Sequence, residues 1–564
     1  MADNLPNQPG SPGKFSMEAR LLVALLLMVG IFTITPYFYK PPAGPTPTTT
    51  PPSAKQATQM TQQPAAAPTP SKPVVPATGQ ISASADQSFT VETDLYRIQF
   101  SNRGAVVKSW QLKKFVDDQH KPLELVNPAS IGKVPPPFAL DFHDKKPSTD
   151  PNMALFTVKP APGNLGVDFE FSDGQAAFRK SFRFLQNSYL SSVTTEASQN
   201  GTPLPHLIAW RGGFGDVTVQ AAASFRHTIY YQSKLIAKDA KSAKDGPFRE
   251  SGNYIFAGIE DKYFAAVVLP KDNISTQVVT YNDGVSPKPG EGEVPEVGAG
   301  VGGESTNTFS LFVGPKDLDI LRKVDPKLEQ IIDWGFFGVI AKPLFIVLSW
   351  LSVNWVHNYG WSIVLITVFI NLLLLPLRFS SLKSARKMQS LQPQIQAINA
   401  KYKNVGLRDP RKAEQNAEVM ELYKKAGANP FGGCLPMLVQ LPVLYAFYKV
   451  LTVTIELRGG HWLWVSDLSQ PEQLPLHFLP IIMIVTQFIM QKMTPNPSMD
   501  PAQAKMMQFM PLMFGFFFYN MSSGLVLYWL TGNLVGILQQ SLMNRLTPAP
   551  PPPAPPQKAL KKKS

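Results

Sequence analysis

The segment WSIVLITVFINLLLLPLR, residues 361–378, most constrains the fold because it is apolar enough to cross a bilayer yet contains Asn371 and Arg378. A membrane-spanning helix needs about 20 mostly apolar residues. A charged group in such a helix is costly unless water or a partner satisfies it. At about 100° per residue, Thr367, Asn371 and Arg378 fall within roughly 40° of one another and form one polar stripe. The stripe favours a functional face, although Arg378 alone is also compatible with a side chain that reaches the membrane surface.

Apolar segments recur along the chain and predict a multi-pass α-helical membrane protein with six transmembrane helices. The first, residues 21–39, is long for a signal peptide and is followed by no A-x-A-like site, so we expect a retained anchor. The segment at 325–357 is rich in Trp and Phe, which predicts an amphipathic helix in the membrane interface. The other five predicted spans are about 359–378, 431–451, 475–492, 506–521 and 523–543.

A polar region between the first and second spans predicts an inserted all-β domain. Short alternating runs such as LYRIQF, FRKSFRF and YFAAVVLP are separated by Gly, Asn, Asp and Pro, which is typical of a β sandwich. The expected organisation is a terminus at 1–20, the first span at 21–39, a Pro-rich linker at 40–84, the β sandwich at 85–324, the interfacial region at 325–357, a five-helix core at 358–545 and a Pro-rich basic tail at 546–564.

The charges of the loops predict the topology. Residues 379–428 hold ten Lys or Arg against four Asp or Glu, and basic loops stay in the cytoplasm. The 452–473 loop holds only Arg458 against three acidic residues, so we expect it outside. Counting spans then places both termini in the cytoplasm and the β domain outside. The net charge of +13 lies largely in these flanks and the tail, which favours membrane contacts over DNA.

The basic loop has a helical pattern of its own. Apolar residues recur at spacings of three and four from Leu382 to Val405 and again from Ala413 to Tyr423. Two antiparallel helices would bury them, so we predict a cytoplasmic helical hairpin at 380–428 with a bend near Pro393. The chain has one cysteine, Cys434, which rules out an intramolecular disulfide and suggests a buried thiol.

Motifs for enzymatic chemistry are missing from the sequence. It contains no G-x-x-x-x-G-K-[ST] pattern, no H-E-x-x-H motif and no Asp or Glu inside the six predicted spans. We therefore expect no enzyme activity, no cofactor and no metal. The spans instead carry neutral polar groups, among them Gln440, Gln487 and Asn533. Each alone is also compatible with an ordinary bond between helices, worth about 1 kcal/mol.

Several segments together resemble a known family. They are residues 361–403, NPFGGCLPMLVQLPV, LHFLPIIMIVTQFIMQKM and PLMFGFFFYNMSSGLVLYWLTGNLVGILQQ, with YRIQFSNRGAVVKSW in the β region matching more loosely. In this order they resemble the YidC/Oxa family of membrane protein insertases, in the bacterial form with a periplasmic domain. The resemblance implies a bacterial inner-membrane protein that inserts and folds other membrane proteins without nucleotide hydrolysis.

The resemblance also implies site residues and partners. The family carries an arginine in a hydrophilic groove, and Asn371 holds its place here, so we expect Arg378 to supply the charge. Implied partners are nascent membrane proteins, the Sec translocon, the ribosome with the signal recognition pathway, and lipids. The expected groove residues are Asn371, Arg378, Gln440, Gln487 and Asn533; the substrate slide is Thr367, Tyr528 and Trp529; the ribosome or partner contacts are Lys383, Arg386, Lys387, Lys401, Lys403, Lys561, Lys562 and Lys563.

Two alternatives remain open at this point. A solute transporter or channel would need a coupling site or a through-pore, and the sequence shows neither. An envelope sensor would bind a ligand with the β domain and signal through the hairpin. Deleting most of residues 85–320 distinguishes an insertase from an envelope sensor, because insertion should survive the deletion and sensing should not.

Overall fold

A computed structural model describes residues 79–219, 222–270, 275–287, 291–402, 409, 411–427, 435–493 and 501–546. The first predicted span and the basic tail lie outside these residues, as do four predicted contact residues, Lys403, Lys561, Lys562 and Lys563. The chain divides into two compact units. The β domain and most of the helices belong to one unit, and residues 384–430 belong to the other.

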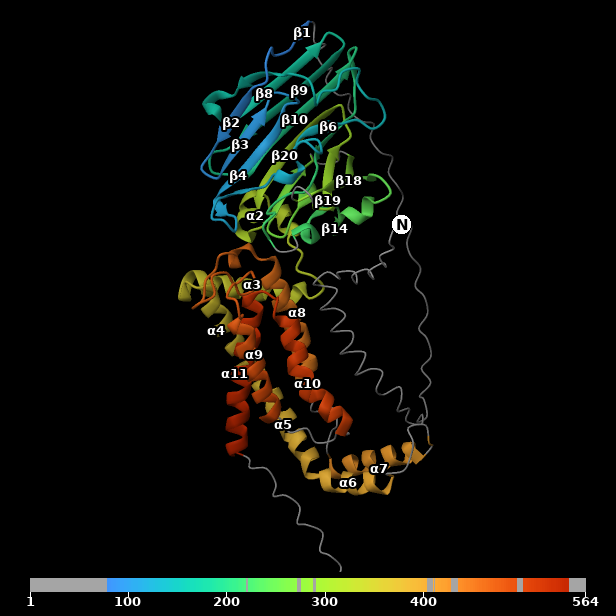
Figure 1. Cartoon of the computed structure of the whole chain (residues 1–564), viewed down its shortest axis with the longest axis vertical. Helices are drawn as coiled ribbons and strands as arrows, with labels where there is room; N and C mark the ends of the chain where they lie inside the picture. Colours follow the sequence, from blue (N-terminus) through green and yellow to red (C-terminus); the bar gives the residue numbers. More distant parts are fainter. Residues whose placement is uncertain are drawn as a thin grey trace, which may run out of the picture. The chain divides into compact units, whose positions relative to one another are not determined.

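The β domain confirms the predicted sandwich and is built from antiparallel strands in three sheets (Figure 1). The largest sheet runs β1-β8-β9-β10-β20-β17-β16-β13-β14, with β7 and β11 at its side. Its strands are β1 (Gln80–Ile81), β7 (Thr157–Pro160), β8 (Gly166–Asp173), β9 (Ala176–Phe184), β10 (Leu190–Gln199), β11 (Thr202–Pro203), β13 (His227–Tyr231), β14 (Leu235–Lys238), β16 (Phe256–Glu260), β17 (Phe264–Leu269) and β20 (Thr306–Pro315). The second sheet contains β15 (Phe248–Gly252), β18 (Thr276–Val285), β19 (Val294–Gly302), β12 (Leu207–Trp210) and β6 (Ala139–Asp141). The third contains β2 (Ser88–Glu92), β3 (Tyr96–Ser101), β4 (Val106–Val116) and β5 (Pro122–Glu124).

Aromatic side chains form the core of the β domain. Strand β9 buries every second residue, as expected for a strand with one face against the core. The ring of Phe138 lies edge-on to Phe182 and Trp210, with centroids 5.4 and 5.9 Å apart, and stacks on Trp110 at 6.2 Å. Aromatic pairs at these distances add to the gain from area burial. Short 3₁₀ turns join the strands: η1 (Pro128–Ser130), η2 (Pro162–Asn164), η3 (Ala222–Phe225) and η4 (Ala240–Ala243).

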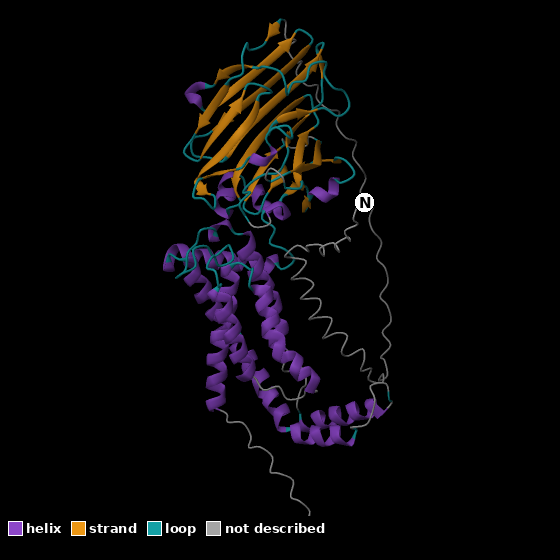
Figure 2. Ribbon diagram, viewed as in Figure 1, coloured by secondary structure: helices purple, strands orange, loops and turns teal. Residues whose placement is uncertain are grey.

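After β20 the described chain is helical (Figure 2). Helix α11 packs against both α4 and α9, and α3 packs against α8. The elements are α2 (Leu318–Val324), η5 (Pro326–Ile331), α3 (Gly338–Leu351), the π-turn η6 (Ser352–Val356), α4 (Tyr359–Leu373), α5 (Leu375–Ser390), α6 (Gln392–Lys401), α7 (Arg411–Ala426), α8 (Leu435–Val453), η7 (Ile455–Leu457), α9 (Phe478–Met493), α10 (Pro501–Phe518) and α11 (Ser523–Leu546).

Few of these helices are long and apolar enough to cross a membrane unaided. Among the described residues one helix qualifies, Gly338–Val356, and the bent pair α4 and α5 qualifies if it is counted as a single span. The first of these lies in the segment expected at the membrane interface. The predicted span 359–378 is divided by a bend of 54° between α4 and α5. Pro376 explains the break, because it has no amide hydrogen to donate to the preceding turn. Six transmembrane helices therefore stay a prediction.

The basic segment after α5 folds into the two helices α6 and α7. Met388, Leu391, Ile395 and Tyr423 are buried together between them and the end of α5. The chain breaks between α5 and α6 just before Pro393, where the sequence predicts a bend. The apolar spacing of threes and fours thus describes a small core shared by these helices.

Candidate functional site

Arg378 is held by a polar residue of α11 that the sequence analysis does not single out. Its Nη1 donates a hydrogen bond to Oε1 of Gln539 at 3.0 Å, and Nε2 of Gln539 lies 3.4 Å from the backbone oxygen of Asn371. A Cβ at Gly536 of α11 would lie 2.7 Å from Sδ of Met490 and 3.3 Å from Nη1 of Arg378, so a larger residue there would crowd both side chains. Gln539 therefore connects α11 to both sides of the bend between α4 and α5.

Thr367 and Asn371, the two residues of the polar stripe that lie on α4, are buried between helices. Thr367 is 0% exposed and its hydroxyl donates to the oxygen of Ile363 at 2.6 Å. Asn371 is 2% exposed and its Nδ2 donates to the oxygen of Thr367 at 2.7 Å. Its Oδ1 has no hydrogen-bond partner among the described residues. Thr367 and Asn371 therefore share a covered face of α4, whereas Arg378 lies beyond the 54° bend, in α5.

A second group of contacts joins α11 to α9. Nε1 of Trp529 donates to Oε1 of Gln487 at 3.2 Å. One turn further on, Nδ2 of Asn533 donates to Oγ1 of Thr486 at 3.2 Å. The indole of Trp529 also packs against Phe518 of α10, with ring centroids 4.9 Å apart. The predicted slide residue Trp529 and groove residue Gln487 are thus direct neighbours.

A third contact joins α11 to α8. Nε2 of Gln440 donates to the hydroxyl of Tyr528 at 2.6 Å, and the ring of Tyr528 stacks on Phe447 with centroids 4.3 Å apart. Tyr528 is only 4% exposed. Together, the three groups show that α11 is the common partner of α4 with α5, of α8 and of α9. We call its contact residues Tyr528, Trp529, Asn533 and Gln539 the α11 polar row.

The α11 polar row consists of neutral side chains that hydrogen-bond to neighbouring helices. Its contacts are amides, hydroxyls and one indole, with Arg378 as the cation. Helices α4, α8, α9, α10 and α11 contain no Asp or Glu. Among the residues that the structure describes, Arg378 is bound by the neutral Gln539 and by no carboxylate, and no group of three or more His, Cys, Asp or Glu is placed to hold a metal. The row itself is therefore uncharged, and Arg378 of α5, bound to Gln539, is the positive charge beside it.

Gln539 and Thr486 are site residues that the sequence analysis misses or leaves without a role. Gln539 lies 11 residues after Tyr528, a spacing that puts both on one face of a helix within about 20°. That spacing was the available signal. It is weak because the LQQ run also fits the polar end of a membrane-spanning helix.

The predicted partner contacts of the basic segment differ in their surroundings. Lys383 is exposed. Nζ of Lys387 donates to the oxygen of Gly427 at 3.1 Å, and Lys401 pairs with Glu418 at 2.6 Å. Arg386 is half-buried and makes interactions within the chain. Of the described four, Lys383, Lys387 and Lys401 are exposed and Arg386 is half-buried.

Comparisons with known proteins cover nearly the whole chain. Residues 350–550 match the family described as 60Kd inner membrane protein, and residues 88–347 match the YidC periplasmic domain. The membrane protein insertase YidC of Pelobacter propionicus is 34% identical over 94% of this chain and 99% of its own length. That of Citrifermentans bemidjiense is 35% identical over the same shares. A crystal structure of an active YidC insertase covers 83% of this chain and 95% of its own, with 21% identity and a TM-score of 0.35. Identity of about one third along almost the full length of both relatives shows that this chain belongs to the YidC family of membrane protein insertases.

Proposed function

We propose that this chain, an inner-membrane insertase, receives segments of other membrane proteins along the α11 polar row and releases them into the bilayer. The observation that supports the proposal is the set of hydrogen bonds that one helix makes with α4, α5, α8 and α9, together with a cation that has a neutral amide as its partner. A peptide entering beside α11 would meet polar groups at several depths. It would also meet lipid-facing apolar surface on the same helices.

The physical role of such a surface is to lower the cost of moving polar peptide through hydrocarbon. Each unsatisfied polar group costs several kcal/mol in an apolar medium, and a charge costs more. Hydrogen-bonding groups inside the bilayer reduce this cost for the translocated tail. Burial of the substrate's apolar segment in lipid then drives insertion, so nucleotide hydrolysis is not required.

Arg378 supplies the positive charge of this proposed groove. The family resemblance puts the usual arginine at the position of Asn371, which is enclosed and neutral here. Arg378 is half-buried and is held by Gln539, so its charge is neither fully hydrated nor cancelled by a neighbouring carboxylate of the described chain. We assign Gln440, Gln487 and Asn533 to the same groove and Thr367, Tyr528 and Trp529 to the slide.

The cellular setting of the proposal follows the charge pattern and the family. Both termini lie in the cytoplasm, the β domain lies in the periplasm, and the basic hairpin and tail contact the ribosome. The Sec translocon, the signal recognition pathway and membrane lipids are further expected partners. Relatives with insertase names along their full length favour this function over a solute carrier or an envelope sensor.

Site-specific photocrosslinking to a ribosome-held nascent membrane protein tests the proposal. A photoreactive residue is placed at 378 or 529, which are half-buried, and at 367 or 371, which are enclosed. Phe369 is 62% exposed and serves as the control, because it reports contacts made from lipid. We expect crosslinks from 378 and 529 above those from 369, and crosslinks from 367 and 371 only if α4 and α11 separate. Equal crosslinking from all five positions contradicts a defined path along α11.

A further inference from the structure

The loop between α8 and α9, residues 454–477, is firmly attached to the ends of the helices around it. The amides of Ser523 and Gly524, at the start of α11, donate to the oxygens of Gln470 and Leu468 at 2.7 and 2.9 Å. The ring of Trp462 lies so close to Gly360 of α4 that a Cβ there would be 2.4 Å from it. The loop therefore behaves as part of the helical core.

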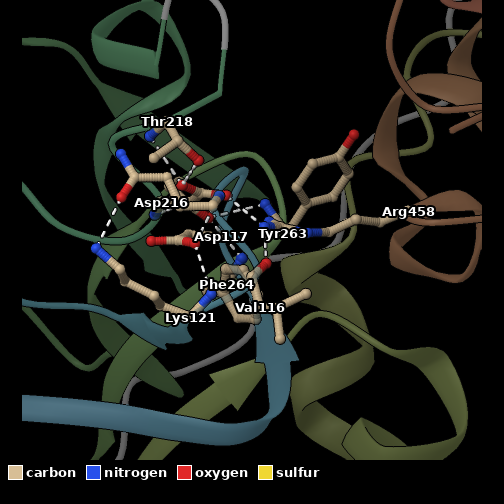
Figure 3. A network of polar contacts seen from close by, with 10 residues as sticks. Val116, Asp117, Lys121, Asp216, Thr218, Tyr263, Phe264 and Arg458 are labelled. Atoms are coloured by element: carbon tan, nitrogen blue, oxygen red, sulfur yellow. Dashed lines mark hydrogen bonds and ion pairs between the residues drawn. The ribbon is translucent and has the colours of Figure 1, made fainter. Parts of the chain in front are cut away.

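Arg458 extends from this loop into the β domain (Figure 3). Its Nη2 lies 2.5 Å from Oδ2 of Asp216 and donates to the backbone oxygen of Val116 at 2.7 Å. The rings of Tyr263 and Phe264 lie beside the guanidinium, with centroids 5.6 and 5.7 Å away. Only 12% of the Arg458 side chain is exposed. One side chain of the core thus contacts three separate segments of the β domain.

Asp216 is the acidic partner of Arg458 and is held in place by its own hydrogen bonds within the β domain. Its side chain is 0% exposed, and its Oδ1 accepts hydrogen bonds from the amide and hydroxyl of Thr218 at 2.8 and 2.6 Å. Its backbone amide donates to Oδ2 of the buried Asp261 at 2.7 Å. Asp118 adds a further negative charge close to the pair. An ionised carboxylate in such a place is costly unless a cation compensates it, and Arg458 is that cation.

Glu456 makes a second contact from the same turn. Its carboxyl group interacts with the backbone amide of Leu318 at the start of α2 and with the negative charges of Asp317 and Asp319. Burial, together with the negative charge of Asp317, raises the pKa of Glu456 to about 8. Between Glu456 and Arg458, Leu457 is 0% exposed. The turn therefore carries, within three positions, a carboxyl group that keeps its proton at neutral pH, a buried leucine and a charged guanidinium.

We propose that the turn Ile455–Arg458 is a joint that docks the β domain on the helical core, and that the ion pair of Arg458 with Asp216 is its pin. This ion pair holds the β domain against the loop, so the domain is attached to the core by more than its two chain connections. Losing the pin releases the β domain while each part keeps its fold. This interaction surface is independent of the proposed insertion path.

Distance measurement between two spin labels in the full-length chain tests the joint. A Cys434→Ser background carries labels at Leu185 of the β domain and Leu476 of the loop before α9, which are 58% and 60% exposed. The chain is placed in lipid nanodiscs, and the width of the distance distribution is recorded. The docked state gives one narrow distribution.

The variants separate loss of the pin from general damage. Arg458→Gln and Asp216→Asn should each broaden the distribution, and the double variant should broaden it no further than either single change. The double variant leaves no uncompensated buried charge, so it provides the test even if a single variant fails to fold. Arg183→Ala is the control, because its ion pair with Asp168 lies within the β domain, and it should leave the distribution narrow.

A charge reversal gives the decisive comparison. Recovery of the narrow distribution in the paired Arg458→Asp and Asp216→Arg variant would establish the ion pair as the pin. A narrow distribution in the neutral double variant would overturn the proposal, because docking would then need neither charge. Broadening by Arg458→Gln without broadening by Asp216→Asn would also overturn it, because Arg458 would then act through another group.

Discussion

Moving the cation between positions 378 and 371 tests how the proposed groove attracts its substrates. Arg378→Ala removes the charge, and Asn371→Arg in that background puts a charge at the position that the family uses. We expect the first change to slow insertion of a substrate with an acidic translocated tail. The second change should restore the rate because it returns a positive charge to the groove. The recovery should be partial, since residue 371 is only 2% exposed and α4 must separate from α11 to admit a longer side chain.

The size of the effect follows from the surroundings of Arg378. Two unit charges about 5 Å apart attract by about 3 kcal/mol at an effective dielectric constant of roughly 20. Arg378 is half-buried at the end of an apolar segment, so water screening reduces this value to about 1–3 kcal/mol. Because 1.4 kcal/mol is a factor of ten, we expect a loss of roughly 5- to 150-fold.

The assay compares two substrates that differ only in the charge of the tail. Each is offered to vesicles that contain the full-length variant, and insertion is measured as protection of the tail from protease. Arg545→Ala is the matched control, because Arg545 is an exposed cation at the end of α11. Equal losses for acidic and neutral tails would refute the electrostatic reasoning, as would an unchanged rate for Arg378→Ala.

Three further changes test other parts of the structure. Gln539→Ala removes the hydrogen-bond partner that orients the Arg378 guanidinium, a bond worth about 1.5 kcal/mol. Insertion of substrates with acidic tails should therefore fall roughly tenfold in the vesicle assay, while insertion of substrates with neutral tails should stay unchanged. The pKa of Glu456 is raised to about 8 in the folded chain, so the contribution of this carboxyl group to the free energy of unfolding falls as the pH rises from about 4.5 to 8. The melting temperature of Glu456→Gln should therefore depend less on pH than that of the unchanged chain. An identical pH profile would contradict burial of this carboxyl group. Arg226→Ala leaves the buried carboxylate of Glu296 uncompensated and should destabilise the chain by about 3–5 kcal/mol in denaturant titration, whereas Arg183→Ala at an exposed pair should cost about 1 kcal/mol or less; similar losses would contradict the role of burial.

Local patterns in the sequence predict the main elements of this fold. Alternation of apolar and polar residues gives the β sandwich, and spacings of three and four give the core that Met388 shares with Tyr423. Pro393 lies beside the break between α5 and α6, and Pro376 lies beside the break between α4 and α5. The apolar periodicity and the prolines that mark these elements are visible within a few residues, so a single sequence contains the signal for each element.

The contacts that define the site and the joint depend on packing between distant segments. Periodicity shows that Thr367 and Asn371 share a face of α4, but it does not show that α11 covers that face. Gln539 has a role because helix packing brings Arg378 within hydrogen-bond distance of it. Arg458 and its acceptor Val116 are 342 residues apart, and no local pattern in either segment indicates the pair.

The hydrogen bonds of the α11 polar row have a consequence for the energetics of substrate entry. In this structure the groups that would bind a substrate already bind one another: Gln440 to Tyr528, Gln487 to Trp529, and Gln539 to Arg378. A peptide that separates α11 from its neighbours therefore exchanges one set of hydrogen bonds for another, and few groups lose a partner at any moment. Such an exchange has a small net free energy, since broken and formed bonds are of the same kind. The hydrogen bonds of the substrate-free structure thus keep the free energies of substrate entry and release similar, as an insertase that releases every substrate into the bilayer requires.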